Sequence, residues 1–343
     1  YLTAIFGWDT WGVSNIADFF GSFIMNGGQM ILWTAIFIVL NVAIVAGGIG
    51  EGIEKFCKVG MPALFVMLII IIIYVACQPG AGEGYKFIFG WDLSPLKEDW
   101  LLVLKSAAGQ MFFSLSLGMG IMITYGSYVK PEVNLNKAVN QIEIFDTGVA
   151  LLAGAMIIPA VYVFSGTEGM SAGPSLMFVS LPKVFAAMGK AGTFVGILFF
   201  VTAIFATLTS CISVLESITA NCMEIFHSGR KKTVLVLTVI YLAASAIIAL
   251  GYSIFYFEVQ LPNGSAAQLL DIMDYVSNSV MMPFIALLST ILIGWVMTPD
   301  YVIDEMKRNG ETFRRKKLYR VMIRYVAPVM MLVLFLQSTG ILA

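Results

Sequence analysis

Long apolar runs separated by short polar segments alternate along the whole chain. Eight of these runs are long enough to cross a bilayer, which takes about 20 residues of helix. The third, fifth and seventh exceed that length, so we expect tilt, a break or extension beyond the lipid in each. The pattern predicts an all-α, polytopic membrane protein with eight transmembrane helices. The runs lie near 30–47, 59–77, 102–129, 146–164, 194–223, 234–252, 269–297 and 321–342.

The composition indicates that most of the surface faces lipid. Apolar residues make up 59% of the 343 positions and charged residues 12%, whereas a soluble domain carries about 25% charged residues. The net charge of −1 gives no reason to expect a nucleic-acid partner. We therefore expect a multi-pass protein of a cell membrane, either a plasma membrane or a bacterial inner membrane.

Basic residues are distributed unevenly between alternate loops. The loops 48–58, 130–145, 224–233 and 298–324 hold 15 of the 20 Lys and Arg residues. Because loops rich in Lys and Arg stay in the cytoplasm, this asymmetry predicts that these four are cytoplasmic. It places residues 1–29 and the C-terminal tail outside.

One extracellular loop, 165–193, is unusually apolar. It contains Gly173-Pro174 and then the amphipathic stretch SLMFVSLPKVF, which is too short to span a bilayer. We expect a helical lid packed over the extracellular mouth. A helix lying on the bilayer surface is the alternative.

Motifs typical of soluble enzymes lack their usual context. Residues Gly169–Gly173 match the pattern of a nucleophile elbow around Ser171, but no strand precedes them, and the only histidine, His227, lies on the other side of the membrane. The four cysteines have no metal-ligand spacing. The sequence therefore predicts that the chain is not an enzyme and has no cofactor.

Small polar residues interrupt the third apolar run. Ser114, Ser116, Gly118 and Gly120 lie in the middle of 102–129. Glycine weakens a helix, and serine can satisfy backbone groups locally, so the helix could break here and expose carbonyl groups and helix ends inside the bilayer. The alternative is that the small residues only let two helices approach closely.

Other apolar runs also carry oxygen-bearing side chains. Asp146 opens the fourth run, where a charge is costly unless it is compensated. The fifth run contains Thr209 and Ser210, with Glu216 two turns after Thr209. Hydroxyl groups alone usually bond back to their own helix. Together with an acidic group, they supply the oxygen ligands that a small hard cation prefers.

Several stretches resemble the neurotransmitter:sodium symporter family in the same order. They are QMFFSLSLGMGIMITYGSYV (110–129), GIGEGIEKFCKVGMPALF (48–65), the residues 206–210, and 271–274. The resemblance implies the leucine-transporter fold, with a discontinuous helix at 102–129. It matches the chain to the family's fourth to eleventh helices. The chain starts at Tyr1, and we expect it to be a fragment that lacks the first three helices and does not transport alone.

The resemblance also implies how the single membrane domain 1–343 is divided. Residues 1–29 would form an extracellular loop and 30–77 the end of a first inverted repeat. Residues 102–297 would form the second repeat, followed by an additional helix at 321–342. Two such repeats imply transport by alternating access.

Cation ligands follow from the resemblance by position. Ser114 resembles a ligand of a first sodium site. Thr209 and Ser210, with the carbonyl group of Ala206, resemble a second. Sodium is thus implied as the coupling ion.

Substrate-binding residues are implied in the same way. Phe113 resembles an aromatic lid, while Ser116, Met119 and Val214 resemble the pocket wall. Met119 is flexible and Val214 is small, so the pocket suits bulky apolar or aromatic side chains. A medium aliphatic substrate is the alternative.

The moving parts are implied as well. Gln110 and Asp274 resemble an outer gate, and Tyr128 and Glu224 an inner gate. Gly52 precedes Pro62 in a motif that lets the family's fifth helix unwind, and the proline removes a helical hydrogen bond.

The chain departs from the family near the first sodium site. The family's seventh helix often has an Asn here, and chloride-dependent members add a nearby Ser. This chain has Asp146 and, one turn later, Ala150. We expect the Asp146 carboxylate to take part in this site and to supply the negative charge that chloride supplies elsewhere. Transport is therefore predicted to be independent of chloride.

The sequence thus predicts a sodium-coupled symporter of an amino acid, neutral and apolar or aromatic. The alternatives are a symporter of the same fold for another solute, and a membrane sensor that does not transport. The expected partners are the amino-acid substrate, sodium ions and the lipid bilayer. A homodimer is left open.

Overall fold

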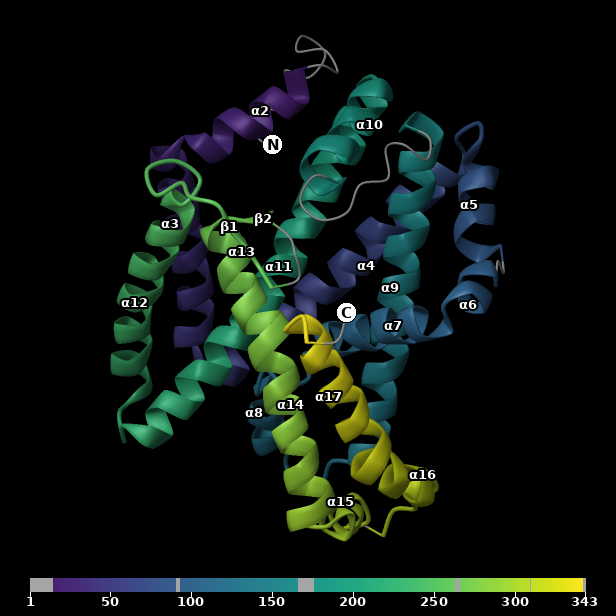
Figure 1. Ribbon diagram of the computed structural model, residues 1–343. Coiled ribbons are helices and arrows are strands. Elements are labelled where there is room, and N and C mark those ends of the chain that lie inside the picture. Colours follow the sequence, from purple (N-terminus) through teal and green to yellow (C-terminus); the bar gives the residue numbers. More distant parts are fainter. Residues whose placement is uncertain (1–14, 91–92, 166–175, 263–265, 309, 342–343) are drawn as a thin grey trace. The chain divides into compact units, whose positions relative to one another are not determined.

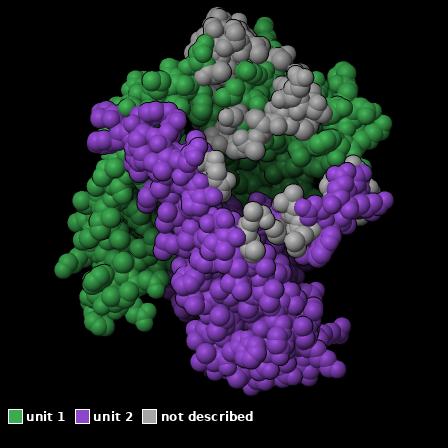
Figure 2. All heavy atoms as spheres, in the orientation of Figure 1, with its two compact units in different colours: residues 1–91, 147–253 green, residues 92–146, 254–343 purple. Residues whose placement is uncertain are grey.

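The computed structural model describes residues 15–90, 93–165, 176–262, 266–308 and 310–341. It divides the chain into two compact units. Unit 1 comprises residues 1–91 and 147–253, and unit 2 comprises 92–146 and 254–343 (Figure 2).

Unit 1 is built from helices that pack along their apolar faces. Figure 1 shows α3 and α12 side by side, and α11 also contacts both α3 and α4. Several short segments are π-helical and are labelled η. The elements are α2 (Asn15–Met25), α3 (Gly27–Ala46), η2 (Ile49–Glu54), α4 (Lys55–Ala76), α5 (Ala81–Phe89), the later part of α9 (Leu135–Ser165), η4 (Leu176–Ser180), α10 (Leu181–Ala187), α11 (Lys190–Ile225) and α12 (Arg230–Leu250).

The core of unit 1 has two apolar clusters. One joins α4, α9, α10 and α11 through fully buried side chains such as Ile71, Val161 and Phe185. The other joins α3, α11 and α12 around Val45 and Ile212, both 0% exposed. Because lipid is as apolar as this core, the hydrophobic effect does not drive the helices together within the bilayer. The dispersion contacts between these closely packed side chains hold them together instead.

Unit 2 contains two long helices that are continuous through π-helical turns. Residues 269–296 form one of them and 316–338 the other. The short antiparallel β1–β2 pair precedes the first (Figure 1). The elements are α6 (Ser94–Glu98), α7 (Trp100–Ser114), α8 (Ile121–Tyr128), the start of α9, β1 (Val259–Gln260), β2 (Ala266–Ala267), α13 (Leu269–Asp274), η5 (Tyr275–Met281), α14 (Met282–Ile291), η6 (Leu292–Val296), α15 (Pro299–Met306), α16 (Lys316–Val321), η7 (Met322–Val326) and α17 (Ala327–Ser338).

Seven helices in the described part of the chain are long and apolar enough to cross a membrane. They match seven of the eight predicted runs, so the prediction of a multi-pass, all-α membrane protein is confirmed. The remaining run, 102–129, forms two shorter helices, since α7 ends at Ser114 and α8 begins at Ile121. The predicted discontinuity of this helix is therefore confirmed.

The break between α7 and α8 has a backbone cause. Ser116, Gly118 and Gly120 have φ angles of 53°, 83° and 77°. These angles lie in the left-handed region, which residues other than glycine rarely adopt. A Cβ atom on Gly118 would also lie 2.8 Å from the carbonyl oxygen of Met282. Both interpretations of these small residues are therefore correct: they break the helix, and they allow a close approach to α14.

Replacing Gly118 with alanine is expected to destabilise the protein by about 2–4 kcal/mol. The alanine would combine a left-handed backbone with a collision against Met282. Gly126→Ala is the matched control, because Gly126 is helical and has open space around it; this change should be neutral or slightly stabilising. Thermal unfolding in detergent measures both. Equal stability of the two variants would contradict the structural account of the break.

The segment after α9 is partly described. Residues 166–175, which include Ser171 and Gly173-Pro174, lie outside the described residues. The following η4 and α10 pack against α11, and Leu181, Val184 and Phe185 are buried. This packing fits the predicted lid better than a helix resting on the bilayer. Its position over a mouth stays a prediction.

One helix boundary differs from the prediction. The fourth apolar run was expected to open at Asp146, but α9 begins well before it, at Leu135. Hydropathy marks where a helix enters lipid, whereas a helix can continue into water with polar residues. Asp146 is therefore in the interior of α9.

Candidate functional site

A serine at the break of unit 2 contacts an acidic residue that is distant in sequence. The hydroxyl group of Ser114 donates a hydrogen bond to Oδ2 of Asp146 over 2.8 Å, across a separation of 32 residues. No cationic side chain in the described part of the chain pairs with Asp146. No basic side chain of these residues therefore neutralises this carboxylate beside the end of α7.

The helix end adds backbone oxygens to this contact. Because α7 stops at Ser114, the carbonyl groups of its last turn lack the amides of a continuing helix. Most of this deficit is met by the turn that follows: the carbonyl of Met111 accepts from the amide of Leu115 (3.1 Å), that of Phe112 from Leu117 (3.0 Å) and that of Phe113 from Ser116 (3.1 Å). Of the last four carbonyl groups, only that of Ser114 has no backbone amide partner among the described residues. Serine, carboxylate and carbonyl oxygens together make an electronegative site that suits a small hard cation.

The predicted substrate residues fall in both units. Phe113, which is 51% exposed, Ser116 and Met119 lie at the break in unit 2. Val214 lies on α11 of unit 1 and is 40% exposed. The structure thus brings three of the four onto one short segment. That segment, 113–119, has no charged side chain.

Three predicted ligands of the second cation site converge on α11. The hydroxyls of Thr209 and Ser210 both donate to the carbonyl oxygen of Ala206, over 2.9 and 3.2 Å. This is the local bonding that hydroxyl groups adopt in membrane helices. Their hydroxyl oxygens still have lone pairs, so three oxygen atoms are gathered at one position of the helix.

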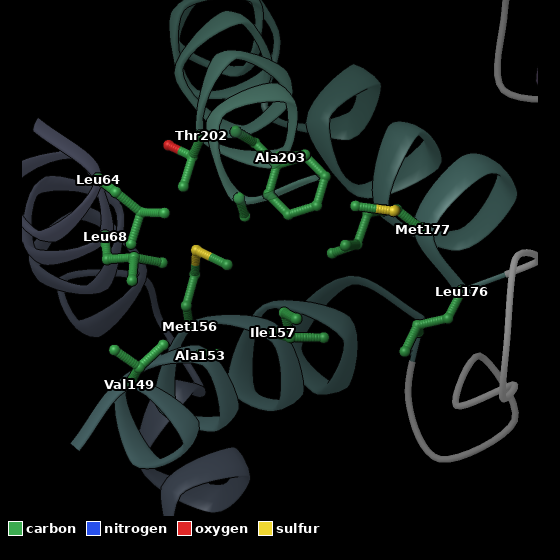
Figure 3. A pocket seen from close by; sticks show the side chains of 13 residues that line it. Leu64, Leu68, Val149, Ala153, Met156, Ile157, Leu176, Met177, Thr202 and Ala203 are labelled. Atoms are coloured by element: carbon green, nitrogen blue, oxygen red, sulfur yellow. The ribbon is translucent and has the colours of Figure 1, made fainter. Parts of the chain in front are cut away.

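An apolar cavity of about 260 Å³ extends to this position from within unit 1. Figure 3 shows side chains of α4, α9, α11 and η4 around it, among them Leu64, Met156 and Met177. Its hydroxyl, that of Thr202, already donates to the carbonyl of Leu198 over 2.7 Å. The cavity therefore offers an apolar wall beside Ala206.

The predicted outer-gate carboxylate has a neighbour that the sequence analysis missed. The side-chain amide of Asn278 donates to Oδ1 of Asp274 over 2.6 Å. Asn278 also lines a cavity of about 180 Å³ between α7, η5, α14 and α17. Gln110 is exposed on α7 of the same unit. Asn278 follows Asp274 by four residues, and this spacing places two side chains side by side on a helix. It was the feature of the sequence that could have predicted the contact.

The predicted inner-gate residues lie at two helix ends. Tyr128 is the last residue of α8 in unit 2 and packs edge-on against Tyr125, with ring centroids 6.4 Å apart. Glu224 is exposed near the end of α11 in unit 1. Each is described within its own unit, and their joint action stays a prediction.

Gly52 and Pro62 lie on either side of the point where an irregular helical turn passes into a regular helix. Gly52 lies in the π-helix η2, and Pro62 lies inside α4. A Cβ atom on Gly52 would lie 2.0 Å from the carbonyl oxygen of Ile44, so only glycine fits there. π-Helical turns often occur at functional sites. The geometry suits a weak helix start, while its unwinding stays a prediction.

The acidic residue near the hydroxyls of α11 has a structural partner. Glu216 is 0% exposed and forms an ion pair with Arg230 of α12. Arg230 also donates to the carbonyl oxygen of Val45 from Nε (3.0 Å) and Nη2 (2.9 Å). The expectation that Glu216 helps to make a cation site is therefore wrong for that residue, because an arginine occupies its carboxylate.

Comparisons with known proteins agree with this fold. Residues 13–342 match the Sodium:neurotransmitter symporter family. An uncharacterized sodium-dependent transporter, YhdH of Bacillus subtilis, is 32% identical over 94% of this chain and 70% of its own length. An uncharacterized sodium-dependent transporter of Haemophilus influenzae is 34% identical over 90% of this chain and 65% of its own length.

A solved structure is also similar. The crystal structure of MhsT in complex with L-phenylalanine is 34% identical, with a TM-score of 0.82. The match covers 98% of this chain and 75% of that chain. The chain thus spans about two thirds to three quarters of the length of these proteins.

Proposed function

Because the chain belongs to the sodium:neurotransmitter symporter family, we propose that it carries the ion-binding and gating helices of a sodium-coupled amino-acid symporter that works by alternating access. The family and the relatives named above are transporters and not enzymes. Sodium is the coupling ion that the relatives' names indicate.

The contact between Ser114 and Asp146 is the observation that carries this proposal. It joins the broken helix α7 to α9 through oxygen atoms, at a carboxylate that pairs with no basic side chain of the described residues. An intramembrane charge of this kind is costly unless it binds something, so it marks an ion site. In the proposed function, these two residues bind the first sodium ion. Ala206, Thr209 and Ser210 bind the second.

The proposed substrate is a neutral amino acid with an apolar or aromatic side chain. Support comes from the segment 113–119, which has no charged side chain. In the proposed function, Phe113 would cover the substrate, and Ser116, Met119 and Val214 would line it. The similar protein MhsT was crystallised with L-phenylalanine, an amino acid of this kind. The backbone amides and carbonyls at a helix break suit the two charged ends of an amino acid.

The remaining predicted residues would open and close access to the site. Asp274, held by Asn278, and Gln110 would close it from outside. Tyr128 and Glu224 would close it from the cytoplasm. The irregular helix start between Gly52 and Pro62 would admit water to the second sodium ion.

Uptake into proteoliposomes by the complete natural protein tests the proposal. Phenylalanine, leucine, glutamate and lysine are supplied with either a sodium or a potassium gradient, in chloride or gluconate. We expect accumulation of phenylalanine or leucine that requires sodium and is the same in both anions. Sodium-dependent binding without accumulation would instead identify a sensor. A requirement for chloride would reject the role of Asp146.

A further inference from the structure

Two aromatic side chains of unit 2 are exposed together near one end of the long helices. The rings of Trp295 and Tyr325 pack edge to face, with centroids 5.8 Å apart, and the residues are 58% and 55% exposed. Trp295 donates from Nε1 to the carbonyl oxygen of Arg324 over 3.0 Å. Exposed Trp and Tyr on membrane helices mark the boundary between hydrocarbon and headgroups.

An arginine lies beside this pair, inside a membrane-spanning helix. Arg324 donates from Nε to the carbonyl oxygen of Gly294 over 3.1 Å. No carboxylate in the described part of the chain pairs with it. Its terminal amino groups are therefore available to an anion from outside the protein.

The same helix begins with further cations that have no acidic partner. Arg314, Lys316 and Lys317 are exposed, and none of them forms an ion pair within the described residues. Lys317 precedes Arg324 by about 10 Å of helix. The free charges therefore continue from Arg324 toward the water. The start of α16, α15 and the end of the helix 269–296 lie together at one end of unit 2 (Figure 1).

Neighbouring cations of the same loop are already neutralised. Lys307 pairs with Asp304, Arg308 with Glu305, and Arg315 with Glu143 (3.9, 3.1 and 3.4 Å). Arg320 pairs with Asp300. The loop thus has two kinds of cation: those paired with a carboxylate of the loop or of α9, and those without an acidic partner among the described residues, which lie next to the membrane boundary.

We propose that this surface binds the phosphate of an anionic phospholipid in the cytoplasmic leaflet. Arg324, Lys317 and Lys316 would hold the headgroup, while Trp295 and Tyr325 lie against the first part of the acyl chains. Guanidinium and ammonium groups are natural donors to phosphate, and clustered cations beside a membrane helix attract anionic lipid. The inference depends on the membrane location of the chain and is independent of its transport activity.

Quenching of tryptophan fluorescence by brominated lipid tests the proposal with the complete natural protein. Vesicles contain phosphatidylglycerol and phosphatidylcholine, and only one of the two lipids carries brominated chains. The difference between the wild-type protein and Trp295→Phe gives the signal of Trp295. Each free cation near an anionic surface contributes about fivefold to binding. We therefore expect Trp295 to prefer phosphatidylglycerol by at least about tenfold.

The variant R314Q/K316Q/K317Q keeps Arg324 and should lower this preference to about fivefold or less. The matched control K307Q/R308Q/R315Q removes the same charge from the same loop, but from paired cations, and should keep most of the preference. A higher salt concentration should weaken it through screening. Equal quenching by both lipids in the wild-type protein, equal loss in the two triple variants, or displacement by millimolar inorganic phosphate would overturn the assignment to a lipid.

Discussion

Exchanging Asp146 for asparagine is expected to lower the apparent sodium affinity of uptake about 30- to 100-fold in chloride-free medium. The change keeps the shape of the side chain and an acceptor for the Ser114 hydroxyl but removes its charge. A unit charge about 4 Å from a cation contributes about 4 kcal/mol at an effective dielectric constant of 20, and partial exposure reduces this value. Initial rates at increasing sodium concentration measure the effect.

A neighbouring acid provides the control for Asp146. Glu143 lies on the same helix and pairs with Arg315, so Glu143→Gln removes the same charge and should change sodium affinity less than about threefold. Adding Ala150→Ser to Asp146→Asn should restore uptake when chloride is present. An unchanged sodium affinity in Asp146→Asn would show that this carboxylate is not at the ion site.

Exchanging Arg230 for alanine is expected to destabilise the protein by about 3–5 kcal/mol, because it removes the cation that pairs with the fully buried Glu216 carboxylate. The change also removes two of the donors to the carbonyl oxygen of Val45, which keeps the hydrogen bond from the amide of Gly47. Equilibrium unfolding in mixed micelles measures the loss.

Two further variants isolate the contribution of this ion pair. Lys231→Ala removes an adjacent, exposed cation from the same helix and should change stability by less than about 0.5 kcal/mol. Adding Glu216→Gln to Arg230→Ala should recover part of the loss, because the buried charge is then absent. Equal stability of Arg230→Ala and Lys231→Ala would contradict the role of this buried ion pair in the stability of the protein.

Much of the fold could be predicted from the order of apolar and polar residues. In lipid, each helix must satisfy its own backbone groups, so a long apolar run has few alternatives to a helix. At Ser116, Gly118 and Gly120 the residues alone left two interpretations open, a break of the helix or close packing against another helix, and the discontinuous helix was implied by the resemblance to the family. The resemblance to the family added the order of the helices and the positions of candidate ligands.

The pairing of side chains across helices was decided by the tertiary structure. Ser114 and Asp146 were both expected at one site, but their contact depends on how α7 and α9 are placed and rotated within unit 2. Glu216 was grouped with nearby hydroxyls because they share a helix, yet the folded chain turns it toward Arg230. Hydropathy reports the solvent around a helix, whereas the neighbour of a buried polar group depends on the packing of the helices around it.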